Sequence, residues 1–221
     1  MYYPHITELY MYKPPNCYTL DILRKCRLWA AKPERFNDPF DCDLEISVGI
    51  TEDVMLESMR QRGDSESAID EYKKSKLGAD GKFAPEEQRR VDNLVQELIE
   101  ENRNMGVLCL SEVCDSILMW SHYTENHKGV CFEFIRAEDN DFGDLELCSP
   151  VKYDRHYPII DLGQMLLKQD GETFESMMKT KSGDWAYEKE WRLITKEGDQ
   201  ECQLPGPLSR IILGIKIEDR V

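Results

Sequence analysis

The chain has 221 residues, with 28 Lys and Arg against 43 Asp and Glu, and a formal net charge of −15. Hydrophobic residues make up 41% of it and aromatic residues 10%, a content that supports a buried core and excludes an intrinsically disordered chain. No apolar run approaches the roughly 20 residues of a membrane span. The acidic total also argues against sequence-independent binding of a nucleic-acid backbone. The first residues lack the pattern of a signal peptide, so we expect a cytoplasmic protein whose eight cysteines stay reduced.

The first 50 residues predict short strands separated by turns. The predicted strands cover residues 9–13, 27–31 and 44–48. Residues 19–25 predict a helix with Thr19 as its N-cap. The sequence Asn-Asp-Pro-Phe-Asp at 37–41 predicts a turn, because Asn and Asp side chains bond their own backbone and Pro fixes φ.

The middle of the chain predicts a helical insertion over residues 51–105 within a single domain that covers 1–221. Apolar residues recur at three- and four-residue steps between Val91 and Ile99, which is the spacing of one helix face. Residues 54–59 indicate another helix. The insertion is therefore expected to serve as a scaffold or a partner-facing cover rather than as a catalytic part.

The last part of the chain returns to strands. Predicted strands cover residues 106–111, 130–135, 151–153, 191–195 and 210–217. Predicted helices cover residues 115–127, 160–168 and 173–180, the first capped by Asp115 and stopped at Gly129. Most neighbouring strands have no long helix between them. The chain therefore predicts an α+β fold whose mainly antiparallel strands form a split, two-sheet core.

The segment from Trp185 to Arg192 combines two tryptophans with two carboxylates. If it enters a strand, alternation places Glu188, Glu190 and Arg192 on one face. Arg192 would then hold one carboxylate ionised while the other meets a substrate. The alternative is a solvated edge strand with ordinary ion pairs, each of which contributes little.

A second group of candidates follows the strand that ends at Ser111. Ser111, His122 and Tyr123 are candidates to line a cleft between that strand and the next helix. Stripes of Met and aromatic residues such as Met119 and Trp120 more often pack in a core. The sequence has no G-x-S-x-G motif, so it does not indicate a hydrolase triad.

Metal sites are weakly indicated. The set that comes closest is Cys114, His122, His127 and Cys131. We expect no zinc there, because a free Cys is more often a small buried hydrophobic residue. The segment 38–49 lacks the Gly and Glu positions of a calcium loop.

Six segments together resemble an uncharacterised bacterial family, domain of unknown function 2971. They are LYMYKP (9–14), LWAAKPERFNDPFDCD (28–43), GVLCLSE (106–112), LMWSHYTENHKGVCFEF (118–134), WAYEKEWRL (185–193) and RIILGI (210–215). The resemblance spans nearly the whole chain except the helical insertion. The family name implies no activity.

A wider resemblance is to the ADP-ribosyltransferases. Their fold opens with a strand that carries an aromatic residue or His, places a Ser at the end of a middle strand, and enters a late strand with Glu, often as Glu-x-Glu. Segments 9–14, 108–111 and 187–193 are similar to these three elements and have the same order. The first strand departs from the pattern, because Tyr10, Tyr12 and Lys13 replace the usual His or Arg.

The resemblance implies chemistry on NAD as a substrate. Breaking the nicotinamide–ribose bond builds positive charge on the ribose, which a nearby carboxylate favours. The resemblance assigns Glu190 to the ribose and Glu188 to the incoming nucleophile. The residues that it implies for NAD binding are Tyr10, Tyr12, Lys13, Ser111, Trp120, His122, Tyr123 and Arg192.

Three hypotheses follow. The first is an NAD-dependent ADP-ribosyltransferase-like enzyme, a bacterial toxin or phage-defence effector, with a protein or nucleic-acid acceptor and an antitoxin or other partner protein. The second is a non-catalytic module whose acidic surface and aromatic cleft bind a basic protein or a small ligand. The third is a metal-dependent hydrolase built on Cys and His or on Asp38, Asp41 and Asp43.

Overall fold

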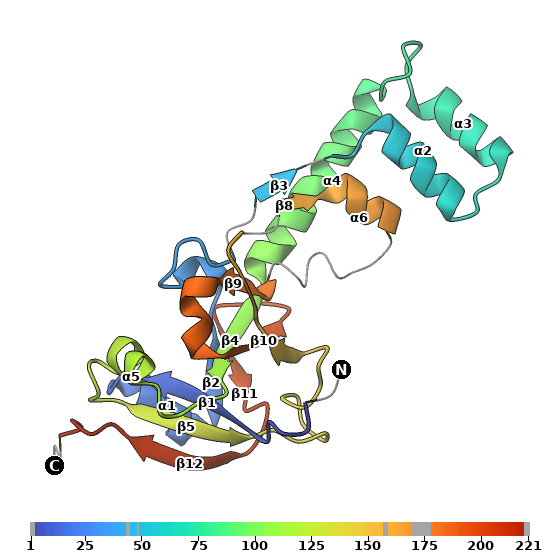
Figure 1. Cartoon of the computed structure of the whole chain (residues 1–221). Coiled ribbons are helices and arrows are strands. Elements are labelled where there is room, and N and C mark those ends of the chain that lie inside the picture. Colours follow the sequence, from blue (N-terminus) through green and yellow to red (C-terminus); the bar gives the residue numbers. More distant parts are fainter. Residues whose placement is uncertain (1–2, 43–44, 48, 157–158, 169–177, 219–221) are drawn as a thin grey trace. The chain divides into compact units, whose positions relative to one another are not determined.

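The computed structural model divides the chain into two compact units (Figure 1). Unit 1 comprises Met1–Asp41, Asn104–His156 and Lys179–Val221, and unit 2 comprises Cys42–Arg103 and Tyr157–Met178. The structure describes residues 3–42, 45–47, 49–156, 159–168 and 178–218. In this part of the chain, no helix has the length and hydropathy to cross a lipid bilayer.

Unit 1 is built on a six-stranded sheet with the strand order β12-β5-β1-β4-β10-β6. Its strands are β1 (Glu8–Lys13), β4 (Gly106–Ser111), β5 (Val130–Ile135), β6 (Cys148–Pro150), β10 (Glu190–Thr195) and β12 (Leu208–Leu213). Each pairing that joins these strands is antiparallel, and Figure 1 shows β12 beside β5. The predicted α+β fold with a mainly antiparallel sheet is confirmed.

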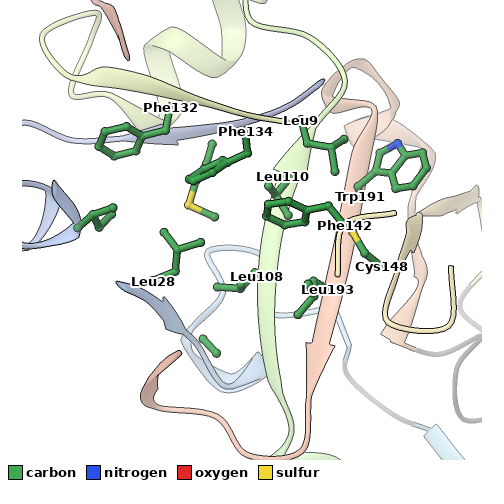
Figure 2. Close-up of a cluster of buried hydrophobic side chains, with 13 residues drawn as sticks. Leu9, Leu28, Leu108, Leu110, Phe132, Phe134, Phe142, Cys148, Trp191 and Leu193 are labelled. Carbon is green, nitrogen blue, oxygen red and sulfur yellow. The ribbon is translucent and has the colours of Figure 1, made fainter. Parts of the chain in front are cut away.

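Strand alternation gives this sheet two chemically different faces. The apolar face carries Leu9 and Met11 of β1, Leu108 and Leu110 of β4, Phe132 and Phe134 of β5, and Trp191 and Leu193 of β10, all in one buried cluster (Figure 2). The residues between them include Tyr10, Tyr12, Cys109, Ser111, Glu190 and Arg192. We call the face that carries this second set the polar face.

A helix and a two-stranded sheet follow β1. Helix α1 (Cys17–Lys25) leads into β2 (Arg27–Ala30), which pairs with β11 (Gln200–Gln203). The predicted N-cap at Thr19 is wrong. Asn16 caps the helix, since its side chain accepts a hydrogen bond from the Thr19 backbone N–H at 3.0 Å.

The helix that follows β4 is shorter than its sequence predicts. Helix α5 (Ile117–Tyr123) begins after Ser116, whose side chain accepts a hydrogen bond from a first-turn backbone N–H, so the predicted cap at Asp115 is wrong. Residues 125–127 have positive φ angles and end the helix before Gly129. Gly129 instead permits a close approach, because a Cβ there would lie 2.1 Å from the carbonyl oxygen at the end of β1.

Three short elements complete the part of unit 1 that forms the site. Strand β7 (Lys152–Asp154) pairs in parallel with β9 (Thr180–Ser182). The 3-10 helix η2 (Gly183–Glu188) then leads into β10. The predicted helix over 173–180 falls partly on residues 173–177, which lie outside the described residues, and its last residue begins β9.

Unit 2 is mainly helical. It contains α2 (Glu52–Gln61), α3 (Glu66–Lys76), α4 (Pro85–Asn104, except its last residue) and α6 (Leu162–Lys168). Strand β3 (Glu45–Ser47) pairs in parallel with β8 (Ile159–Asp161). Its largest apolar cluster is formed by Ile50, Phe83, Val91, Val95 and Leu162. The helices predicted from residues 54–59 and 91–99 are confirmed as α2 and α4, whereas α3 was not predicted.

Candidate functional site

Five charged side chains of unit 1 meet beside the polar face of the sheet. This ion cluster consists of Asp41 from the turn after η1 (Pro33–Arg35), Lys181 of β9, Glu188 of η2, and Glu190 and Arg192 of β10. The ammonium group of Lys181 lies 2.6 Å from the carboxylate of Glu188 and 2.8 Å from that of Glu190. Lys181 therefore bridges the two acids of the Glu-x-Glu motif.

Arg192 forms ion pairs with two further carboxylate oxygens of the ion cluster. Its Nε donates to Glu190 Oε1 at 2.8 Å, and its Nη2 donates to Asp41 Oδ2 at 2.6 Å. The backbone N–H of Glu190 also donates to the Tyr153 hydroxyl at 2.7 Å. The side chain and backbone of Glu190 are thus fixed before any ligand binds.

The ion cluster is removed from water. The exposed fraction is 0% for Arg192, 4% for Glu190 and 5% for Lys181. Burial acts to raise the pKa of Glu190, but the charges of Arg192 and Lys181 outweigh it and lower this pKa to about 2. Burial acts to lower the pKa of Lys181, but Glu190 and Glu188 outweigh it and raise this pKa. Both groups therefore remain charged at neutral pH, and the formal charges of the five side chains add to 2 − 3 = −1.

A cavity of about 300 Å³, the main pocket, adjoins the ion cluster. Six of the predicted site residues line it: Tyr10, Tyr12, Lys13, Tyr123, Glu188 and Glu190. The hydroxyl of Tyr123 donates to Glu188 Oε1 at 2.6 Å, and burial raises the pKa of Tyr123 well above its usual range. The pocket thus combines aromatic walls with two oriented carboxylates, and its volume is at the small end of the ligand-binding range.

Strand register explains why distant segments meet at this pocket. Tyr10 of β1 lies opposite Ser111 of β4, and Ser111 lies opposite Glu190 of β10. The three residues form a row across neighbouring strands, which are spaced about 4.8 Å apart. The three segments that resemble ADP-ribosyltransferase elements therefore lie side by side.

Four other predicted residues do not line the main pocket as the structure describes it. They are Ser111, Trp120, His122 and Arg192. Ser111 is fully buried, and its hydroxyl donates to the backbone carbonyl of Glu188 at 2.6 Å. Trp120 packs edge-on against Tyr12 and donates its indole N–H to a backbone carbonyl. The His122 ring lies 6.4 Å from the rings of Tyr123 and Trp185, measured between centroids.

The turn predicted at 37–41 is present and contributes to the site. Asp38 accepts a hydrogen bond from the Phe40 backbone N–H at 2.9 Å, and it also accepts one from the indole N–H of Trp185 at 2.7 Å. Asn37 and Asp41 from the same turn line the main pocket. The contact with Trp185 ties this turn to η2, the element that carries Glu188.

Sequence reasoning did not select Lys181, Tyr153 or Cys109. Lys181 and Tyr153 lie on two short strands whose pairing is parallel and non-local, so no periodic pattern marks them. Cys109 lies opposite Arg192 in the sheet and lines the main pocket. Alternation along the predicted strand 106–111 would have placed Cys109 on the same face as Ser111.

Cys109 is exposed to the main pocket, although protein atoms surround its thiol closely. These surroundings and the charge of Glu190 both raise the pKa of the thiol above its usual value. The nucleophilic form of cysteine is the thiolate. The neutral thiol is favoured, and it offers Glu190 only a weak donor.

Metal ligation has no visible basis in the part of the chain that the structure describes, where no three His, Cys, Asp or Glu side chains form a group that could hold an ion. Cys114, His122, His127 and Cys131 are all among these described residues. Asp41 contacts the cations of the ion cluster. Asp43 lies outside the described residues.

Comparison with known proteins gives one match. Residues 119–193 match the model of a family described as Protein of unknown function (DUF2971). They make up about a third of the chain and contain four members of the ion cluster, Lys181, Glu188, Glu190 and Arg192. No curated protein and no solved structure matches the chain. The match confirms the predicted resemblance to the DUF2971 family over the segment that carries most of the ion cluster.

Proposed function

We propose that this protein is an ADP-ribosyltransferase-like enzyme that breaks the nicotinamide–ribose bond of NAD and transfers the ADP-ribose group. The observation that carries the proposal is the main pocket, in which the ionised Glu190 and the second acid Glu188 face a wall of tyrosines. The three segments that resemble ADP-ribosyltransferase elements lie on the neighbouring strands β1, β4 and β10, which supports the same proposal.

The proposed chemistry needs a fixed negative charge near the ribose. When the bond between the ribose carbon and the nicotinamide nitrogen breaks, the electron pair leaves with nicotinamide and the ribose becomes cationic. Glu190 is already oriented by Arg192 and Lys181, so it stabilises this cation without reorganising. The ion cluster has a net formal charge of −1, which also favours the cationic nicotinamide ring.

Glu190 also has room for a substrate hydroxyl. A carboxylate oxygen accepts about two hydrogen bonds, and Oε1 of Glu190 accepts one from Arg192. The thiol of Cys109 faces this carboxylate and is a weaker donor than a ribose hydroxyl. We therefore assign Glu190 to the ribose.

Glu188 is placed to act on the acceptor. Its Oε1 accepts from Tyr123 and its Oε2 accepts from Lys181, each at 2.6 Å, so each oxygen retains one acceptor position. We assign Glu188 to the proton of the incoming hydroxyl or amine, which it would remove as the new bond to the ribose carbon forms.

The other walls of the main pocket suit the anionic part of a dinucleotide. Lys13 and Arg35 line the same pocket as Glu190. A ligand with a cationic ring at one end and phosphates further along matches this separation of charge. The rings of Tyr10, Tyr12 and Tyr123 offer flat apolar surfaces for nicotinamide.

The first experiment measures nicotinamide release from NAD by the purified chain and its Glu190→Gln variant. Glutamine keeps the shape of the side chain but removes its charge, so release should fall about 100- to 1,000-fold. The matched control is Glu138→Gln, which changes an exposed glutamate on a loop and should keep the wild-type rate. Tryptophan fluorescence melting checks folding, because all four tryptophans of the chain lie in unit 1.

Two results would overturn the proposal. The first is a wild-type protein that releases no nicotinamide. The second is a folded Glu190→Gln variant that releases it at the wild-type rate. Glu188→Gln should slow transfer to an amine acceptor more than it slows hydrolysis by water, and equal effects would remove the assignment of Glu188 to the acceptor.

We further propose that the activity is that of a bacterial toxin or phage-defence effector, acting on a protein or nucleic acid and restrained by a partner protein. Induced expression in bacteria should arrest growth, whereas Glu190→Gln should allow growth at the same protein level. Equal growth arrest by both forms would show that the toxicity does not depend on this chemistry.

A non-catalytic binding module is the second candidate. The observation that favours it is the completeness of the ion cluster, in which both oxygens of Glu190 accept bonds from Lys181 and Arg192. Buried ion pairs of this kind can also serve to specify a unique fold. This candidate predicts saturable binding of a ligand in the main pocket with no release of nicotinamide.

A further inference from the structure

A second cavity, of about 620 Å³, lies in unit 1 and is formed almost entirely by the first 35 residues. We call it the side groove. Its walls come from the end of β1, from α1, from β2 and from η1, and Glu201 of β11 also lines it. Its volume falls within the range of small-molecule sites.

Alternation along β2 places a flat ring and a guanidinium group beside each other in this groove. Leu28 and Ala30 are buried in the apolar core, although Leu28 also reaches the wall of the groove. Arg27 and Trp29 are exposed and line the groove. Residues two apart on a strand are separated by about 7 Å along the chain. Trp29 is 50% exposed, which is a large apolar surface to leave in water.

The side groove is positively charged although the chain as a whole is acidic. The charged residues that line it are Lys13, Lys25, Arg27, Arg35, Asp21 and Glu201. Their formal charges add to 4 − 2 = +2, whereas the whole chain carries −15. The sign is therefore reversed locally, which favours an anionic ligand.

Two of the four cations of the groove, Lys13 and Arg27, are placed to bind an anion. The other two, Lys25 and Arg35, each form an ion pair at 2.6 Å with a carboxylate. No ion pair joins Lys13 or Arg27 to a carboxylate of the described residues. Burial lowers the pKa of Lys13 below its usual range, and an anion bound beside it would oppose that shift.

We propose that the side groove binds a nucleoside phosphate, with the base stacked on Trp29 and the phosphate held between Lys13 and Arg27. A simple anion would contact the two cations and leave the indole ring in water. A nucleotide contacts the cations through its phosphate and the indole ring through its base. Stacking of a base on an aromatic side chain contributes about 1–3 kcal/mol. The inference does not require turnover in the main pocket.

The side groove and the main pocket share three lining residues, Lys13, Trp29 and Arg35. The bound nucleotide therefore has two chemical sources, a free mononucleotide or the adenylate half of a dinucleotide that continues into the main pocket. Both have the same base and phosphate chemistry in the groove, and binding measurements separate them.

The experiment measures binding of AMP, adenosine and inorganic phosphate by calorimetry to the full chain. AMP should bind at least tenfold more tightly than either fragment. Arg27→Gln should weaken AMP binding about tenfold and leave adenosine binding unchanged. Trp29→Leu should weaken AMP binding about five- to 100-fold, in line with the loss of one stacked ring. The matched control is Arg24→Gln on α1, which does not line the groove and should bind AMP like the wild type.

Binding of NAD shows whether the groove takes a free mononucleotide or the adenylate half of a dinucleotide. NAD that binds more tightly than AMP, with the same loss in Arg27→Gln, indicates the adenylate half of a dinucleotide. Equal binding of AMP and NAD indicates a mononucleotide. The proposal is overturned if AMP binds no more tightly than adenosine or phosphate, or if Arg24→Gln and Arg27→Gln weaken binding equally. Because AMP carries no nicotinamide, its binding is independent of whether the chain cleaves NAD.

Discussion

Replacing Lys181 by methionine tests whether the ion cluster is a buried, mutually dependent network. The ammonium group donates to Glu188 and Glu190 at 2.6 and 2.8 Å, and its residue is only 5% exposed. Methionine keeps an unbranched side chain but leaves the net formal charge of the cluster at −2 instead of −1. Removing one partner of a buried ion pair costs about 3–5 kcal/mol, because the remaining charge is left uncompensated.

The loss should be partly reversed by a second change in the same cluster. Glu188→Gln in the Lys181→Met background returns the net charge to −1, so the double variant should regain at least about 1 kcal/mol. The matched control is Lys152→Met on β7, where the side chain is 76% exposed and lies 3.9 Å from Asp154. An exposed pair of this kind contributes about 0–1 kcal/mol, so this control should unfold almost like the wild type.

Urea unfolding followed by tryptophan fluorescence measures these differences in unit 1, which contains every tryptophan of the chain. With a slope of about 2 kcal/mol per molar urea, a loss of about 4 kcal/mol lowers the midpoint by about 2 M. The reasoning is refuted if Lys181→Met unfolds within about 1 kcal/mol of the wild type. It is also refuted if adding Glu188→Gln destabilises the protein further.

Three other changes have defined outcomes. Because the pKa of Glu190 is lowered to about 2 in the folded chain, its stabilisation is present above about pH 4.5 and lost as the pH falls to about 2. Urea titrations over this range should show about 3 kcal/mol of loss that Glu190→Gln lacks, and parallel profiles would contradict the shift. Tyr123→Phe removes the 2.6 Å hydrogen bond to Glu188 and should cost about 1–3 kcal/mol in thermal melting; an unchanged melting temperature would contradict this. Gly129→Ala places a Cβ 2.1 Å from a backbone oxygen and should cost more than about 2 kcal/mol, whereas Gly183→Ala, whose nearest neighbour is 4.0 Å away, should cost less; equal melting temperatures would refute this.

Local signals in the sequence located most of the secondary structure of unit 1. Short runs of apolar and aromatic residues predicted β1, β4 and β10. Alternation of apolar and polar residues predicted β5, because the side chains of a strand point to opposite faces. The same signals were weaker at helix ends. Thr19 and Asp115 are acceptable cap residues, but Asn16 and Ser116 cap the helices, since the choice among neighbouring polar residues depends on where the preceding chain turns.

The sequence by itself also selected the two acids and the tyrosines of the main pocket, through residue type and order along the chain. Only the tertiary structure brought Lys181 to Glu190, and Asp41 to Lys181 and Arg192. Asp41 is far from the other members in the sequence, and Lys181 lies on a strand whose parallel pairing leaves no periodic signal. A short-range pattern decides which face of a strand a residue occupies. The packing of distant segments decides which charges are close enough to fix the ionisation of Glu190, since electrostatic interaction depends on distance and burial.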